Sequence, residues 1–158
     1  EFQLRRSPNF LLLHDLSPRH GDVLLTHCEH VHAQIEEFLG DASNHLGHGP
    51  IGIIQASSPD QFFRIADPYF GDAEGQMNSI GGLFVQNGHG HVLLNGTGLW
   101  EPEPVVTHEL AHVAVQHQNL PLWLDEAIAM GIEGLAHGES MHMQDAADVL
   151  NFTEIRRA

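Results

Sequence analysis

The segment 105–115 constrains the fold of this chain most, because it carries the spacing His-Glu-x-x-His. If the segment is helical, His108 and His112 differ by only about 40° of rotation and lie on one face. Two imidazoles placed in this way can occupy two corners of a tetrahedral zinc site without bending the backbone. Glu109 would then be the general base that takes a proton from a water on the metal. The apolar residues around the motif favour a helix over about 104–118.

A second segment supplies a third candidate ligand. Residues 121–130 predict another helix, with Pro121 suited to its first turn. Glu126 follows His112 by 14 residues, which is enough for the first helix to end near Asn119 and the chain to turn back. Two histidines and one carboxylate leave a fourth position for water, which is the pattern of a catalytic rather than a structural zinc site.

Together, these two segments carry a resemblance to a known family. The runs His-Glu-Leu-Ala-His at 108–112 and Leu-Pro-Leu-Trp-Leu-Asp-Glu-Ala at 120–127 resemble the gluzincin metallopeptidases. The likeness is to the small bacterial peptidase-MA-like domains and to the glutamate helix of thermolysin-like enzymes. It is specific over residues 105–130 and looser back to about Asn9.

The resemblance implies a ligand set and a base. Zn²⁺ would be bound by His108, His112 and Glu126, and Glu109 would act as base and then as acid. The chain departs from the thermolysin-like pattern at Met130, where those chains carry an Asp that steadies a zinc-bound histidine.

The resemblance also implies where a peptide would bind. In zincins, a strand that precedes the motif forms the upper rim of the cleft, and the substrate backbone adds to it as a further strand. Gly81, Gly82, Leu83 and Phe84 occupy that position, and glycine lets another backbone approach closely. The alternative is that these glycines merely relieve a turn.

Gluzincins place a Tyr or His beyond the glutamate helix to stabilise the oxyanion. No Tyr follows Tyr69 in this sequence, which leaves His137 and His142 as the candidate oxyanion donors. Either of them is otherwise a surface residue.

The apolar runs and their lengths predict an α+β domain. Strands are expected near 9–14, 51–56, 81–86 and 91–95, and helices at 22–39 and 104–118. With the resemblance, this becomes a zincin-like fold, a twisted mixed sheet packed on a long backing helix and an active-site helix, followed by a glutamate helix. Asn-Gly between the last two strands indicates a hairpin.

Three segments carry more local expectations. The helix at 22–39 is amphipathic, with an apolar stripe formed by Leu24, Cys28, Val31, Ile35 and Phe38. The nearby His27, His30 and His32 do not all fall on one face, so a solvated surface is preferred over a metal site. A capped helical turn is expected to begin at Ser58, and a loop is expected at 67–76. The second helix is expected to weaken and end over 131–138.

Composition limits the partners and the compartment. At 158 residues the chain is expected to form a single domain over 1–158, and a formal charge of −15 with no Lys argues against nucleic acid or an anionic membrane as a partner. The single Cys28 excludes an internal disulfide, and no apolar run approaches the length of a membrane span. The abrupt start at Glu1 and the helical pattern near Ala158 predict a domain excised from a longer, bacterial chain. A signal for export would then lie outside this segment, and the location is not predicted.

Three interpretations remain open. The first is a zinc-dependent peptidase that hydrolyses peptide or protein substrates through metal-activated water and the Glu109 base. The second is a catalytically weak or inactive zincin-fold domain that binds zinc or a protein partner, which Met130 and the missing Tyr favour. The third is a chance motif in an α+β protein with 14 His.

Overall fold

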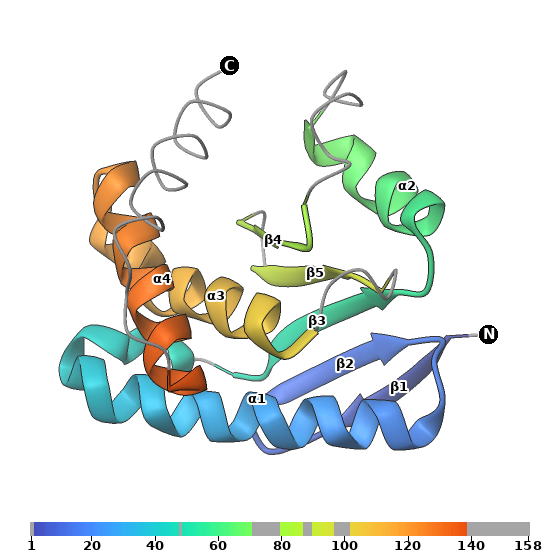
Figure 1. Ribbon diagram of the computed structural model, residues 1–158, viewed down its shortest axis with the longest axis horizontal. Coiled ribbons are helices and arrows are strands. Elements are labelled where there is room, and N and C mark those ends of the chain that lie inside the picture. The colour runs from blue at the N-terminus through green and yellow to red at the C-terminus, as the bar shows by residue number, and fades with distance from the viewer. Residues whose placement is uncertain (1, 48, 71–79, 87–89, 97–101, 139–158) are drawn as a thin grey trace.

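In a computed structural model of the chain, residues 2–47, 49–70, 80–86, 90–96 and 102–138 are described (Figure 1). The strands are β1 (Gln3–Arg6), β2 (Phe10–His14), β3 (Ile51–Ala56), β4 (Gly82–Val85) and β5 (His91–Asn95). The α-helices are α1 (Pro18–Leu39), α2 (Pro59–Phe70), α3 (Pro102–Val115) and α4 (Leu122–His137), with short 3₁₀ helices η1 (Gly40–Gly47) and η3 (Gln116–Gln118). The predicted mixture of helices and strands is confirmed.

The strands form one five-stranded mixed sheet in the order β1-β2-β3-β5-β4. The three central strands β2, β3 and β5 run parallel, and the edge strands β1 and β4 are antiparallel to their neighbours. The predicted pairing of the last two strands is confirmed, with Gly82 opposite Leu94 and Phe84 opposite Val92. β4 is therefore an edge strand of the sheet.

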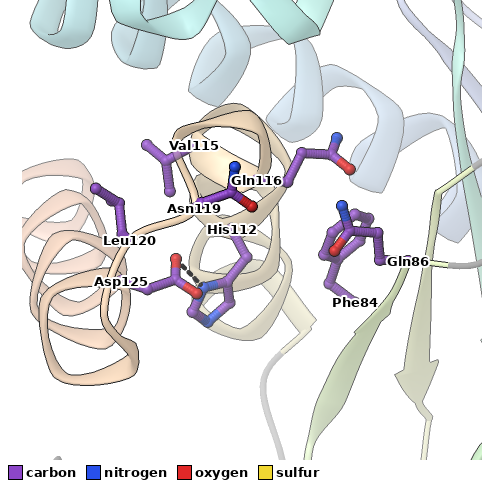
Figure 2. A pocket seen from close by; sticks show the side chains of 8 residues that line it. All are labelled: Phe84, Gln86, His112, Val115, Gln116, Asn119, Leu120 and Asp125. Atoms are coloured by element: carbon purple, nitrogen blue, oxygen red, sulfur yellow. Dashed lines mark hydrogen bonds and ion pairs between the residues drawn. The ribbon is translucent and has the colours of Figure 1, made fainter.

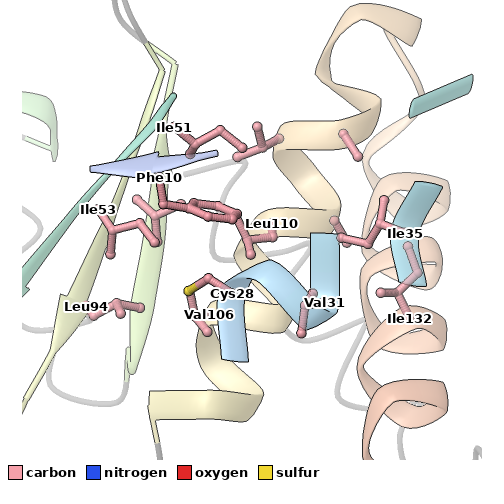
Figure 3. Close-up of a cluster of buried hydrophobic side chains, with 14 of the residues drawn as sticks. Phe10, Cys28, Val31, Ile35, Ile51, Ile53, Leu94, Val106, Leu110 and Ile132 are labelled. Atoms are coloured by element: carbon pink, nitrogen blue, oxygen red, sulfur yellow. The ribbon is translucent and has the colours of Figure 1, made fainter. Parts of the chain in front are cut away.

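Helices cover both faces of the sheet (Figure 1). One face packs against α1 and α3 through a large apolar cluster, which Figure 3 shows around Phe10, Ile53, Cys28 and Leu110. The other face packs against α2 through a smaller cluster that includes Phe62. Residues of β3, β4 and β5 alternate between the two clusters, as the period of two in a strand requires, whereas β2 contributes Phe10 and Leu12 to the larger one alone. The layer of α1 and α3 is the one that holds the His-Glu-x-x-His segment.

The sequence did not predict β1. Its burial is slight, and its one large apolar side chain, Leu4, is 66% exposed. The strand is held mainly by backbone pairing with β2, so no buried side-chain period reveals it.

The long helix differs from the prediction at its start and ends at Leu39 as predicted. It begins at Pro18 rather than near residue 22, because the side chain of Ser17 accepts a hydrogen bond from the backbone N–H of His20 and caps the first turn. Phe38 is 62% exposed, and Leu39 packs on the core in its place.

The predicted solvated face for three histidines of α1 is correct only for His30, which is exposed. His32 is buried and meets the ring of Phe10 edge-on. His27 is half-buried, and its Nε2–H donates to the Glu103 carbonyl of α3 at 3.1 Å. Both rings flank the apolar stripe of α1, so the elements that pack on this stripe also cover them: β2 covers His32 and α3 covers His27.

One further boundary is corrected. The expected loop at 67–76 is wrong over residues 67–70, because α2 continues through Pro68 to Phe70, and residues 71–76 lie outside the described residues. The second helix ends within the predicted range 131–138, but it stays helical to His137 and ends at Gly138, which adopts a left-handed φ of 70°. Burial of Ala129 and Ile132 on the core accompanies this continuation. Within the described ranges, no helix has the length and apolar character needed to cross a membrane.

Candidate metal centre

The helices α3 and α4 form a hairpin that brings the two predicted motifs together. α3 passes into η3, and Asn119 then takes the left-handed conformation, with φ 46° and ψ 45°. The chain turns there, and α4 begins after Pro121. α4 returns along α3, because Asp125 near its start contacts His112 and Glu133 further along contacts His108. The predicted turn near residues 119–121 is thus the structural basis of the site.

The hairpin gathers the three predicted ligands. The ligand atoms of His108, His112 and Glu126 all lie within 4.8 Å of one another. Oε2 of Glu126 is 3.4 Å from Nε2 of His108 and 3.7 Å from Nε2 of His112. Tetrahedral coordination at about 2.0–2.1 Å separates two ligand atoms by about 3.3 Å. The observed distances are therefore close to those that a single bound ion requires.

A carboxylate orients each of the two histidines. Nδ1–H of His108 donates to Glu133 at 3.1 Å, and Nδ1–H of His112 donates to Asp125 at 2.9 Å, which Figure 2 shows as a dashed line. With Nδ1 protonated, the lone pair of each ring is on Nε2, which faces Glu126. Carboxylates that orient metal-binding histidines in this way also raise their basicity.

Sequence reasoning missed Asp125 and Glu133 as supporting residues. A signal was present, because Glu133 follows Glu126 by seven residues and so lies on the same face of a helix. Asp125 and Glu133, rather than a residue at the position of Met130, contact the two histidines.

The electrostatics of the cluster favour a cation. Glu126 and His112 are each 3% exposed and Glu109 is 5% exposed, and buried carboxylates are costly without compensating charge. Burial alone would lower the pKa of His108, but the carboxylates of Glu126 and Glu133 raise it to about 10. The negative potential that holds a proton on this ring would also attract a metal ion.

Two buried polar atoms at the cluster support the same conclusion. Among the described residues, neither Nε2 of His112 nor Oε2 of Glu109 has a hydrogen-bond partner. A metal ion would satisfy the nitrogen, and a water beside it would satisfy the carboxylate. The donor set therefore fits a metal ion.

Gly82 brings β4 close to Glu109. A Cβ atom at this position would clash with Cγ1 of Val105 and would lie 3.3 Å from Cγ of Glu109. Only glycine allows so close an approach of the strand to the helix. The backbone carbonyl of the preceding Gly81 accepts a hydrogen bond from the N–H of Asn95 at 2.8 Å. Gly82 thus has a packing function and does not merely relieve a turn.

The other predicted substrate-binding residues lie in β4 with different orientations. Leu83 is buried in the cluster beneath α2, whereas Phe84 is half-buried on the side of α3. The side chain of Leu83 is therefore turned away from the metal cluster, and any contact with a peptide would come from its backbone. Substrate binding by residues 81–84 stays a prediction.

A cavity of about 290 Å³, not predicted from the sequence, opens beside His112 (Figure 2). Its other walls come from β4 and the residue after it, from the end of α3, and from the turn into α4: Phe84, Gln86, Val115, Gln116, Asn119, Leu120 and Asp125. Segments from three parts of the chain form it, so no single sequence motif reveals it.

The two candidate oxyanion donors have different outcomes. His137 is exposed, and its ring stacks on that of His27 with centroids 5.9 Å apart. His27 also contacts Thr107, so this stack lies beside the first half of α3. His142 lies outside the described residues. The oxyanion function stays a prediction for both.

Comparisons of the chain with models of protein families, with curated proteins and with solved structures gave no significant match.

Proposed function

We propose that this chain is a zinc-dependent peptidase of the gluzincin type, with a zincin-like arrangement of its sheet, its backing helix and its two site helices. One observation carries the proposal. Each histidine of His-Glu-x-x-His is hydrogen-bonded at Nδ1 to a carboxylate, His108 to Glu133 and His112 to Asp125. The Nε2 atoms of both histidines face the carboxylate of Glu126. A chance motif would not be expected to have the third ligand and both orienting carboxylates in place.

The donor set supports zinc over the common alternatives. His108, His112 and Glu126 would hold the ion, and a set of two imidazoles and one carboxylate is typical of catalytic zinc. Mg²⁺ and Ca²⁺ prefer oxygen ligands, so two nitrogen donors disfavour both. When bound, zinc would acidify a water molecule and polarise a substrate carbonyl.

The residues around the ion have distinct functions in this proposal. Glu109 accepts the proton of the attacking water and returns it to the leaving amine. Asp125 and Glu133 keep both histidines in the tautomer that can bind metal. The free edge of β4, which Gly82 holds beside Glu109, pairs with the peptide backbone.

The alternative is a zincin-fold domain that binds zinc or a protein partner and cleaves little or nothing. The absence of any Tyr after Tyr69 favours it, because the usual oxyanion donor is then missing from this segment. Met130 no longer favours it, since Asp125 and Glu133 support the histidines. Under either function, a charge of −15 without Lys disfavours nucleic acid as the partner.

Metal analysis combined with peptide cleavage tests the proposal. Elemental analysis after purification with zinc should find one zinc per chain, and His108→Ala should lose it. The zinc-loaded protein should cleave members of a diverse peptide library, with cut sites identified by mass spectrometry. Absence of zinc would contradict both functions, whereas full zinc without cleavage, also in a chain extended past residue 158, would favour the binding domain.

A further inference from the structure

We propose that the cavity beside His112 binds a basic side chain, arginine or lysine, of the peptide substrate. This inference rests on the proposed peptidase function and specifies its substrates. It depends on three observations, namely the position of the cavity, the chemistry of its walls and the distribution of charge around it.

The cavity adjoins the metal cluster through His112. The ring of His112 lines it on one side and belongs to the candidate ligand set on the other. A substrate side chain in the cavity would therefore belong to a residue next to the bond that is cleaved. A volume of about 290 Å³ has room for one long side chain.

The walls combine an apolar part with hydrogen-bond acceptors. Phe84, Val115 and Leu120 can pack against the methylene groups of a long side chain. The amide nitrogen of Gln116 donates to the Val113 carbonyl at 3.0 Å, which leaves Oε1 of Gln116 as an acceptor. Asp125 accepts from His112 through one oxygen, and its second oxygen is a further acceptor.

These acceptors discriminate between kinds of side chain. Lysine and arginine offer several donors at the end of an apolar stem, and they match both parts of the wall. An apolar side chain would leave the acceptors without a partner after excluding water from them.

Among the described residues, the charged side chains of the two helices beside the cavity, α3 and α4, are all acidic when their histidines are neutral. The four Arg of the described residues are Arg5 and Arg6 in β1, Arg19 in α1 and Arg64 in α2. The helices α3 and α4 carry five acidic residues and no Arg: Glu103, Glu109, Asp125, Glu126 and Glu133. Five carboxylates and one divalent ion still leave a charge of −3 on this hairpin. A cationic side chain is attracted to such a region, and an acidic one is repelled.

The test uses zinc-loaded protein and one peptide that the library shows to be cleaved. Versions of the peptide carry Arg, Lys, norleucine or Glu at each position flanking the cleaved bond. At one flanking position, kcat/KM should be higher for Arg and Lys than for norleucine by about tenfold or more, the effect of a charge-assisted hydrogen bond. Glu should be the poorest of the four, and added salt should reduce the differences.

Binding and charge variants give independent measurements. Zinc-loaded Glu109→Gln should bind the uncleaved peptides in the same order of affinity by titration calorimetry. Gln116→Glu should strengthen the preference for basic peptides, and Gln86→Arg, at an exposed position of the cavity wall, should weaken it. Val23→Arg adds the same charge as Gln86→Arg at an exposed site on α1 and should leave the preference unchanged.

The outcomes separate this inference from the function on which it rests. Cleavage without any preference for basic residues, or a preference that Gln86→Arg and Gln116→Glu do not move, would overturn the inference and leave the peptidase in place. Failure of the zinc-loaded protein to cleave any peptide, also in a chain extended past residue 158, would overturn both.

Discussion

Two helices of the same layer, α1 and α3, each carry histidines that turn toward the interior, but only those of α3 meet carboxylates on a neighbouring helix. His32 of α1 is buried, as His112 of α3 is, and its Nδ1 lies 3.5 Å from Glu36. Glu36, however, is on the same helix, and its side chain is 54% exposed. The pair is therefore a surface contact of residues four apart rather than part of a converging site.

His27 shows the same contrast from another side. Its Nε2–H is shared between the Glu103 carbonyl and the Thr107 hydroxyl, at 3.1 and 3.0 Å, so the ring is used in packing α1 on α3. The Nε2 atoms of His108 and His112 instead face Glu126. Histidine content and helical spacing are thus insufficient to make a metal centre, and the returning helix α4, with three carboxylates directed at α3, makes the difference.

The largest expected effect tests whether the α3 site is catalytic. Glu109→Gln keeps the shape of the side chain and both histidines but removes the proton acceptor. Peptide cleavage should fall by about 10²–10⁴-fold, the usual contribution of a general base, while zinc remains bound. Initial rates and elemental analysis on the same samples measure the two effects. Glu37→Gln, the same change at an exposed position of α1, is the matched control and should leave both unchanged.

The next effect separates a ligand from its neighbour. Glu126→Ala should weaken zinc binding by more than about 100-fold, beyond what loss of a supporting residue costs. Glu109→Ala should weaken it much less, because Glu109 is placed beside the ion as base and not as ligand. Competition with a chromogenic chelator measures both affinities, and equal losses in the two variants would contradict the assignment of Glu126.

A smaller effect is expected from the carboxylates that orient the histidines. Asp125→Asn and Glu133→Gln should each lower zinc affinity by about 10- to 100-fold. Glu36→Gln makes the corresponding change beside His32 and should not alter zinc affinity. If Glu36→Gln had the same effect as Glu133→Gln, the contrast between the two helices would be lost.

The comparison also explains which parts of the site the sequence predicted. His108, His112 and Glu126 were predicted because a fixed spacing on one helix and one return of the chain determine their positions. Asp125 and Glu133 were not, because their partners depend on how α4 is rotated against α3. The cavity beside His112 depends in addition on where β4 ends, which no local pattern determines.

The fold shows the same limit. The strands β2, β3, β4 and β5 were predicted to within two residues, because their apolar runs are long enough to be recognised between turn residues. β1 has almost no buried side chain, so no apolar pattern predicts it, and α2 continues through Pro68, although proline usually ends a helix. The burial of His32 could not be foreseen from its helix alone, since Phe10 of β2 is among the residues that cover it.

The smallest expected effect concerns a carboxylate of α1 that serves the fold. Glu29 accepts hydrogen bonds from the backbone N–H of Asn9 at 2.9 Å and from its side-chain amide at 2.7 Å, and so ties α1 to the start of β2. Burial alone would raise the pKa of Glu29, but hydrogen bonds of this kind to the ionised form lower it below its ordinary value. A carboxyl group with a lowered pKa in the folded state stabilises the protein above the pKa of the unfolded chain, which is about 4.3 for Glu. That stabilisation is lost as the pH falls through the lower pKa of the folded state.

Glu29→Gln should therefore reduce the free energy of unfolding by about 1 kcal/mol at pH 7, and the difference from the unaltered protein should shrink below about pH 4. Urea unfolding at several pH values measures it, with zinc content unchanged. A difference that stayed constant down to pH 3 would show that the charge of Glu29 has no part in this contact.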